Sequence, residues 1–289
     1  MPNPAPETMG LIYRLPTSEL HPHPDNPFAI RDDPEMKELT ESVQKFGVLV
    51  PAIARASPDG GYELISGHRR KYACEKNSID FMPVIVLELN DDEAIIQMID
   101  SNIQRENILP SERAKAYKMK MDAIRRQGAR TDLTSPNVSA KFRSDDTVGE
   151  KDGVSGDTVR NYMALNNLSP PLMLMVDEKK IALSPAYQIA ALSPPEQEWL
   201  LETMNSEQAT PSLSQAQRLK KLSQSGKLNE DTMLSIMSEQ KKPMRNDITL
   251  SGEKLRKYFP RSYTPMQMEA VIFKLLDAWQ KKRQRDQSR

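Results

Sequence analysis

The pattern of apolar residues changes type near residue 90, and this change limits what the chain can fold into more than any other feature of its sequence. Before residue 90, short apolar stretches suited to strands alternate with stretches of helical spacing. After it, helical spacing continues almost to the end of the chain. Interleaved strands and short helices are typical of a small α/β domain, and the later pattern is typical of an all-α domain. We therefore predict an α+β chain with these two parts in this order.

The first part carries local signals for most of its elements. Residues 34–46 have apolar side chains at three- and four-residue spacing, with Pro34 at the start and Gly47 just past the end, which predicts a helix. The proline-rich run at 21–28 excludes a helix and a central strand, because proline lacks a backbone donor. The other predicted elements are strands at 11–15, 52–56, 62–65 and 82–89 and a short helix at about 68–76.

Charge is divided between the two parts of the chain. The 40 Lys and Arg residues balance the 40 Asp and Glu residues, yet residues 1–100 carry 9 basic and 17 acidic side chains, and residues 101–289 carry 31 and 23. Such asymmetry indicates two tasks on one chain, one of them with an anionic polymer, unless charge merely drifts between domains. The single cysteine, Cys74, excludes an internal disulfide framework. With no membrane-length apolar run and no signal-peptide pattern, we expect a cytoplasmic protein.

Residues 153–162 predict the second helix of a helix-turn-helix pair. Ser155 is a good N-cap, because its hydroxyl can accept a backbone N–H of the first turn. The candidate DNA-binding residues are Ser155, Gly156, Asp157, Thr158, Arg160 and Asn161. Of these, we expect Gly156, Asp157, Arg160 and Asn161 to point outward. Arg160 suits guanine or phosphate, and Asn161 suits adenine.

The helix expected before this one is weakly marked. Only one helical turn is predicted between Thr147 and Asp152, and we place the start of its core near Val138. The helix predicted at 111–127 is strongly basic, with seven Lys and Arg residues between Arg113 and Arg130, which favours DNA because such side chains contact phosphate. The alternatives are an ordinary capped helix in a bundle and a solvated basic face.

Two further segments are typical of a phosphate site. The predicted strand 62–65 runs into Ser-Gly-His-Arg-Arg at 66–70, where a helix begins, and a helix N-terminus beside two arginines suits phosphate. In the second segment, the amide oxygen of Asn102 can ligate Mg²⁺, and Arg105 can pair with phosphate. The alternatives are arginines on a plain surface and an asparagine that caps a helix.

In this order, the motifs resemble those of the ParB-like chromosome and plasmid partition proteins. Residues 67–70 resemble the arginine-rich box of that family, and residues 102–108 with Pro110 and Glu112 resemble its Asn-x-Gln-Arg segment. The segments at 26–27, 47–51 and 153–168 occupy the places expected in the family, and the resemblance covers about Leu15 to Leu192. It implies a ParB/sulfiredoxin-like α/β N-terminal domain, a helical helix-turn-helix domain and a C-terminal helical segment that dimerises. We place their boundaries at residues 10–104, 105–240 and 241–289.

The resemblance implies a DNA clamp that responds to CTP and Mg²⁺. The family recognises a palindromic centromere-like site as a homodimer, slides on double-stranded DNA after the nucleotide closes its N-terminal domains, and works with a Walker-type, ParA-like ATPase. By position, the implied nucleotide-binding residues are Gly67, His68, Arg69, Arg70, Ser101, Asn102 and Arg105. Asn102 would also hold Mg²⁺. The implied place of action is the bacterial cytoplasm, on the nucleoid or a plasmid.

Two residues depart from the family pattern. His68 stands where the family has glutamate, and Ser101 stands where it has an acid implicated in hydrolysis. A serine hydroxyl is no general base at neutral pH, and the side chain of Asp100 points about 100° away on a helix. We therefore name no catalytic residue and expect CTP binding with slow or absent hydrolysis.

Other functions remain open on the same residues. A transcriptional regulator or nucleoid-occlusion factor would use the same contacts, and a ParB-like serine kinase would share the N-terminal domain. A sulfiredoxin-like enzyme would need a reactive cysteine where Gly67 stands, and Cys74 lies about two helical turns on.

The last predicted helix, residues 264–283, supports a dimer. Its apolar residues recur on one face and end at Trp279, so the face would be exposed on a short tail unless it packs on a partner or folds back on its own chain.

Overall fold

The computed structural model describes residues 11–58, 60–105, 107–131, 144–239, 255, 257–260 and 262–287. Contacts between residues divide the chain into two compact units, one that ends at Glu239 and one that begins at Gln240. The first unit holds the mixed α and β elements and most of the helices, and the second holds one long helix. The α+β class predicted from the sequence is therefore confirmed.

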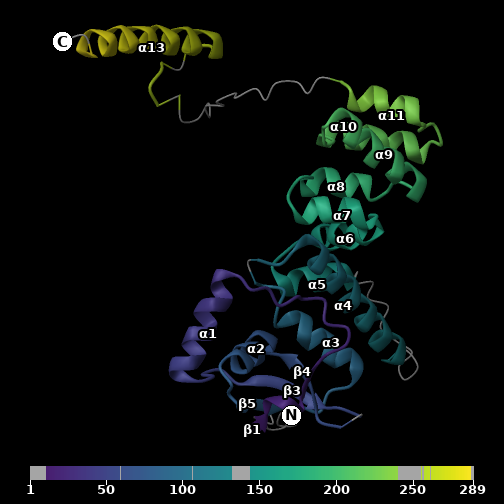
Figure 1. Cartoon of the computed structure of the whole chain (residues 1–289). Helices are drawn as coiled ribbons and strands as arrows, with labels where there is room; N and C mark the ends of the chain where they lie inside the picture. Colours follow the sequence, from purple (N-terminus) through teal and green to yellow (C-terminus); the bar gives the residue numbers. More distant parts are fainter. Residues whose placement is uncertain are drawn as a thin grey trace, which may run out of the picture. The chain divides into compact units, whose positions relative to one another are not determined.

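A five-stranded sheet forms the base of the first unit (Figure 1). Its strands, in the order β1-β5-β3-β4-β2, are β1 (Ile12–Pro16), β5 (Phe81–Val86), β3 (Ala52–Ala56), β4 (Tyr62–Ser66) and β2 (Leu20–Pro22). β3 and β4, at the two predicted strands 52–56 and 62–65, form an antiparallel hairpin, with Ala56 opposite Tyr62. β2 lies at the edge of the sheet, where the missing N–H of Pro22 is tolerated.

Helices cover both faces of this sheet. A short 3-10 helix, η1 (Thr17–Glu19), and three α-helices surround it: α1 (Pro34–Phe46), α2 (His68–Lys76) and α3 (Asp91–Asp100). Leu64 belongs to a buried cluster with Met36 of α1 and Cys74 of α2, whereas Ile65 packs with Met98 of α3. Because successive strand residues point to opposite faces, α1 and α2 cover one face and α3 covers the other. The carboxyl end of β4 thus leads directly into α2.

The rest of the first unit is helical. Its elements are α4 (Pro110–Thr131), α5 (Ser144–Asp152), α6 (Gly156–Ala164), η2 (Leu165–Asn167), α7 (Pro170–Asp177), α8 (Leu183–Ile189), α9 (Pro194–Glu207), α10 (Leu213–Gln224) and α11 (Glu230–Met237). α4 packs against α3 and α6. One buried cluster joins Phe28 and Ile99 to Tyr117, Val148 and Val159, so strand-rich and helical parts share a core. The domain boundary at 104/105 stays a prediction.

α3 ends at Asp100, because Ser101 is its C-cap. Two local predictions need correction. β5 ends at Val86 instead of residue 89. α5 has nine residues, more than the single turn predicted between Thr147 and Asp152. Its sequence signal is weak because Gly149 brings its backbone against the α5–α6 turn: a Cβ there would lie 2.6 Å from the carbonyl oxygen of Val154. Val138, where its core was expected to begin, lies outside the described residues.

The second unit contains α13 (Pro265–Gln287). Within this unit, Phe273, Leu275, Leu276 and Trp279 expose more than half of their surface, whereas Met268 is buried. Across the described ranges, no helix combines the length and the apolar character that a membrane crossing requires.

Candidate nucleotide and DNA sites

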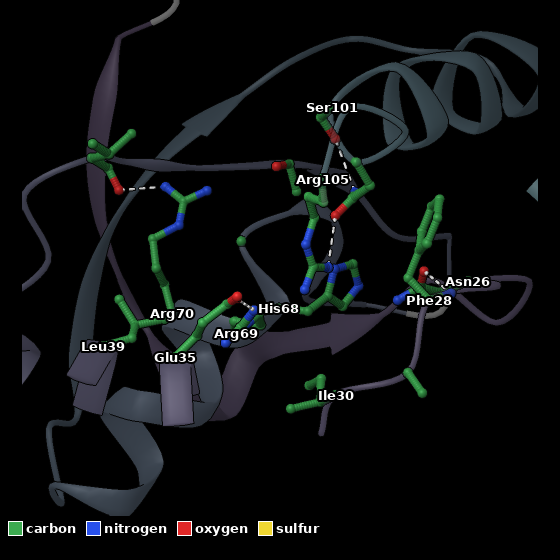
Figure 2. A pocket seen from close by; sticks show the side chains of 15 residues that line it. Asn26, Phe28, Ile30, Glu35, Leu39, His68, Arg69, Arg70, Ser101 and Arg105 are labelled. Carbon is green, nitrogen blue, oxygen red and sulfur yellow. Dashed lines mark hydrogen bonds and ion pairs between the residues drawn. The ribbon is translucent and has the colours of Figure 1, made fainter. Parts of the chain in front are cut away.

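One cavity of about 470 Å³ lies where β4 runs into α2 and where the turn after α3 approaches it. All seven residues that the sequence assigns to a nucleotide line this cavity: Gly67, His68, Arg69, Arg70, Ser101, Asn102 and Arg105. Figure 2 shows Arg70 at one end of the cavity and Asn26 and Phe28 at the other. The structure therefore brings together two segments that are more than 30 residues apart in the chain.

Gly67 sets the entry into α2. Its φ is +107°, a left-handed conformation that favours glycine, and a Cβ at this position would lie 2.8 Å from the Cβ of Ala52. The close approach places the first turn of α2 beside the cavity. Backbone N–H groups of a first turn have no partner within their own helix, which is why helix N-termini bind phosphate.

The three arginines of the cavity differ in their partners. Arg69 pairs with Asp33 (Nη2 to Oδ1, 2.9 Å) and with Glu35 (Nη1 to Oε2, 3.2 Å), and both carboxylates come from the start of α1. Arg70 donates through Nη1 to the backbone carbonyls of Val50 and Pro51, at 2.5 and 2.6 Å. Burial lowers the pKa of Arg70. A half-buried guanidinium whose partners among the described residues are backbone carbonyls favours an anion beside it.

Arg105 is the third cation of the cavity. Its Nη1 donates to Oδ1 of Asn102 at a distance of 3.4 Å. Burial lowers its pKa, and the positive charge of Arg69 lowers it further. A guanidinium whose charged state is disfavoured by a neighbouring cation gains from an anion placed beside it.

His68 is a half-buried base whose Nε2 atom is buried. Among the described residues, the buried polar atoms without a hydrogen-bond partner are Nε2 of His68 and Nε of Arg69. Burial lowers the pKa of His68 to about 4, with smaller contributions from His23, Lys71 and Arg70. The imidazole is therefore neutral at pH 7, and its unpaired nitrogen is available to a ligand.

The lowered pKa of His68 makes the stability of the fold depend on pH. Between about pH 6.5 and pH 4 the unfolded chain binds a proton that the folded chain does not, so the free energy of unfolding falls as pH falls through this window. In His68→Gln this contribution, up to about 3 kcal/mol, should disappear. Urea unfolding of both proteins at several pH values measures the difference; parallel pH profiles would contradict the prediction.

Ser101 and Asn102 close the end of α3. Oγ of Ser101 donates to the carbonyl of Met98 at 2.9 Å, and Nδ2 of Asn102 donates to the same carbonyl at 2.8 Å. These bonds show that Asn102 caps the helix, as the alternative interpretation held. They also fix its side chain so that Oδ1 faces Arg105 and the cavity. An amide oxygen in this place suits Mg²⁺, which takes one or two protein oxygens together with phosphate oxygens.

Several lining residues were not predicted as site residues. Glu35 and Leu39 come from α1, and Val50 comes from the loop before β3. The family segments at 26–27 and 47–51 were the available signal for this part of the wall. Asp100 does not line the cavity, because its carboxylate pairs with Lys120 at 2.6 Å.

α5 and α6 occupy the positions of the helix-turn-helix pair that the sequence predicts to contact DNA. Ser155 is the N-cap of α6, and its Oγ accepts the backbone N–H of Thr158 at 3.2 Å. Asp157 and Asn161 are exposed, and Arg160 forms ion pairs with Asp145 and Asp157. Gly156 was predicted to point outward and is buried.

The burial of Gly156 has a simple cause. The turn between α5 and α6 is so tight that a Cβ on Gly149 would lie 3.0 Å from the backbone nitrogen of Gly156. Gly156 therefore serves the contact between the two helices and presents no outward surface.

Comparison with known proteins agrees with this geometry. A family model described as the ParB N-terminal domain matches residues 3–103, which include the β4–α2 junction and the turn after α3. Residues 3–103 are therefore similar to the N-terminal domain of ParB proteins. This ParB-like chain is 29% identical to the chromosome-partitioning protein Spo0J of Thermus thermophilus over 68% of its own length and 66% of that protein.

Other relatives carry two different names. A nucleoid occlusion protein of Listeria innocua is 27% identical over 66% of this ParB-like chain and 62% of that protein. A probable chromosome-partitioning protein ParB of Vibrio cholerae is 27% identical over 70% of this chain and 63% of that protein. The matched region thus spans a little under two thirds of each of these relatives.

Two crystal structures of C-terminally truncated ParB from Caulobacter crescentus are also similar. The one complexed to the centromeric parS site is 22% identical, with a TM-score of 0.46 and coverage of 78% of this ParB-like chain and 98% of that chain. The one complexed with CTP-γ-S is 26% identical, with a TM-score of 0.32 and coverage of 64% and 95%.

Proposed function

We propose that this ParB-like chain is a site-specific DNA-binding protein and a DNA clamp that responds to CTP and Mg²⁺, acting in the segregation of a chromosome, plasmid or mobile element. One observation carries this proposal: the cavity gathers three guanidinium groups and a neutral imidazole, and two of its buried nitrogen atoms lack partners. Its volume of about 470 Å³ lies within the usual range of about 300–1,000 Å³ for small-ligand sites.

Each part of the cavity has its own task toward a triphosphate. Arg70 and Arg105 bring positive charge to which no carboxylate of the described residues is bonded, and the first turn of α2 adds backbone donors. Arg69 forms ion pairs with Asp33 and Glu35 at the start of α1. A phosphate that binds Arg69 competes with these carboxylates and so weakens the contact between Arg69 and α1. Asn102 would hold Mg²⁺, which when bound neutralises phosphate charge. The resemblance to the family selects CTP among nucleotides.

Binding of a nucleotide can change the surface of this unit through the loop that contains Val50. Arg70 holds the carbonyls of Val50 and Pro51, so a phosphate that competes for Arg70 disturbs that loop. Phe46, Leu49 and Val50 each expose about two thirds of their surface beside the cavity. Apolar side chains this exposed favour an interface, and we assign them to the closure of the N-terminal domains of a dimer.

The DNA contacts are assigned to α4 and α6. The exposed basic residues of α4, Lys115, Lys118, Arg125 and Arg126, supply phosphate affinity, whereas Lys120 is buried. Arg160 and Asn161 of α6 supply sequence preference. With these contacts, the protein would act in the bacterial cytoplasm on a nucleoid or plasmid, together with a Walker-type, ParA-like ATPase.

A homodimer formed through α13 is part of the proposal. The exposed apolar side chains of this helix need a partner surface, and a second copy of the same helix supplies one. A chain truncated before Thr264 is expected to sediment as a monomer at concentrations where the full chain is a dimer. An unchanged dimer in sedimentation velocity would refute this role of α13.

Hydrolysis of CTP is expected to be slow or absent. Ser101 is bonded to the carbonyl of Met98 and offers no base, and Asp100 is paired with Lys120. Rapid CTP turnover that is lost in Ser101→Ala would contradict this expectation.

Nucleoid occlusion is the second candidate function, because relatives of that name match the chain as fully as the partition proteins do. A serine kinase is less well supported, since it leaves α5 and α6 without a task. Sulfiredoxin chemistry needs an accessible thiolate, whereas Cys74 is buried in the core and burial raises the pKa of its thiol.

The decisive test is a titration of the purified full chain with CTP, ATP and GTP, each with Mg²⁺ and with or without DNA from its own locus. We expect saturable binding of CTP, tighter in the presence of this DNA, and phosphate release near background. Equal weak binding of all three nucleotides, unaffected by DNA, would overturn the proposal. Formation of phosphoserine from ATP or ADP would support the kinase instead.

A further inference from the structure

Arg160 of α6 does not stand alone in the helix-turn-helix pair. Its Nη1 bonds Oδ2 of Asp145 on α5, and its Nη2 bonds Oδ1 of Asp157 on its own helix. The residue proposed to read DNA is thus bridged by two carboxylates, one from each helix of the pair.

The two carboxylates differ in burial. The side chain of Asp145 is 13% exposed, whereas the side chain of Asp157 is 80% exposed. An exposed ion pair contributes little, because water and salt compete for it. A carboxylate as buried as Asp145 costs free energy unless it keeps a charged or hydrogen-bonding partner. Asp145 is therefore the anchor of Arg160, and Asp157 is a contact that DNA can displace.

An anchored guanidinium has two advantages for reading a base. Its plane is fixed before binding, so less side-chain entropy is lost when two N–H groups meet the acceptors of guanine. The negative charge of Asp145 also weakens the pull of Arg160 on a bare phosphate, which disfavours binding to other sequences.

We propose that Asp145 is a specificity-determining residue: it holds Arg160 in the orientation that reads one base pair and lowers the affinity of that arginine for phosphate alone. This inference rests on the proposed DNA-binding function. It makes Asp145 a positioning residue, which acts on DNA through Arg160.

Selection from a random-sequence duplex library by the full-length protein tests the inference. We expect the wild-type protein to enrich one motif, and Arg160→Ala to lose the preference at one base pair of each half-site, with about 5- to 150-fold weaker binding to the wild-type motif. Asp145→Asn should lose the preference at the same base pair while binding a mixed-sequence duplex at least as tightly as the wild type. Asp157→Asn, the matched control, should keep the preference.

The other outcomes are equally distinct. Asp145→Glu keeps a carboxylate and should restore part of the preference, which a purely structural loss would not show. A D145N protein that enriches the wild-type motif unchanged overturns the inference and leaves the proposed function intact. Loss of preference at every position in D145N, with a lowered thermal unfolding midpoint, also overturns it, because the residue then serves only the fold. A wild-type protein that enriches no sequence overturns the proposed site-specific function itself.

Discussion

Replacing Arg70 with alanine is expected to weaken the binding of CTP by about 10- to 150-fold. A hydrogen bond to a charged group contributes about 1.5–3 kcal/mol, and the fold-change follows from that range. The charge of Arg70 is less compensated than that of Arg69, since the guanidinium of Arg70 bonds backbone carbonyls whereas Arg69 already pairs with Asp33 and Glu35. Isothermal titration of the full chain with CTP and Mg²⁺ measures the change.

The variants around this prediction separate charge from geometry. Arg70→Lys keeps the charge but loses the planar fork, so it should bind CTP with intermediate affinity. Arg69→Ala should also weaken CTP binding. Part of this effect will come from α1, which loses the ion pairs of Arg69 with Asp33 and Glu35. Arg14→Ala is the matched control, because this arginine lies over the ring of Phe81 at the far edge strand. CTP affinity in R70A equal to that of the control would refute the assignment, provided that both variants unfold at the wild-type urea midpoint.

Asp152→Asn is expected to destabilise the first unit by about 3 kcal/mol. Its carboxylate accepts two hydrogen bonds from Nζ of Lys120, at 2.9 and 3.1 Å, and the lysine side chain is only 1% exposed. Removing one partner of a buried ion pair leaves a charge without compensation, which costs about 3–5 kcal/mol. The value lies at the low end because Asp100 still pairs with Lys120 at 2.6 Å. Urea unfolding followed by circular dichroism measures it.

A double-mutant cycle sharpens this test. Lys120→Met alone leaves Asp152 buried without its lysine and should also destabilise the fold, whereas the double variant K120M/D152N removes both charges and should recover most of the loss. Asp100→Asn is the exposed counterpart and should cost about 1 kcal/mol or less. Additive losses in the double variant would show that Lys120 and Asp152 do not interact as a pair.

Sequence signals predicted the elements that carry their own start and stop residues. α1 has the predicted bounds, because Asp33 caps its first turn, Pro34 begins it and Gly47 adopts the left-handed conformation that ends it. α5 was underestimated because its packing uses the backbone at Gly149 instead of an apolar stripe, and a stripe is the signal that periodicity detects.

The sequence predicted which motifs line the candidate site, but it did not predict the ion pairs that their side chains form. The motifs at 67–70 and 101–105 line one cavity, as a shared site requires. The carboxylates that hold Arg69 come from α1, more than 30 residues earlier, and no spacing rule connects them to it. The same holds for the pair of Asp145 and Arg160, which depends on how two helices cross. The roles of these residues toward CTP and DNA stay predictions.

The buried cluster that joins Phe28 and Ile99 to Tyr117 and Val159 has a consequence for how such chains can be recombined. A segment taken from a similar protein and joined near residue 104 would bring side chains shaped for a different partner surface. The side chains of the two joined segments would then pack poorly against each other. This poor packing would loosen α3, and the residues at its end line the cavity. A second buried cluster joins Ala114 of α4 to Leu165 and to Met237 of α11, so a join after α6 would divide that cluster as well. The smallest unit that can be exchanged intact therefore runs from the first strand through α11, with its nucleotide cavity and its helix pair inherited together.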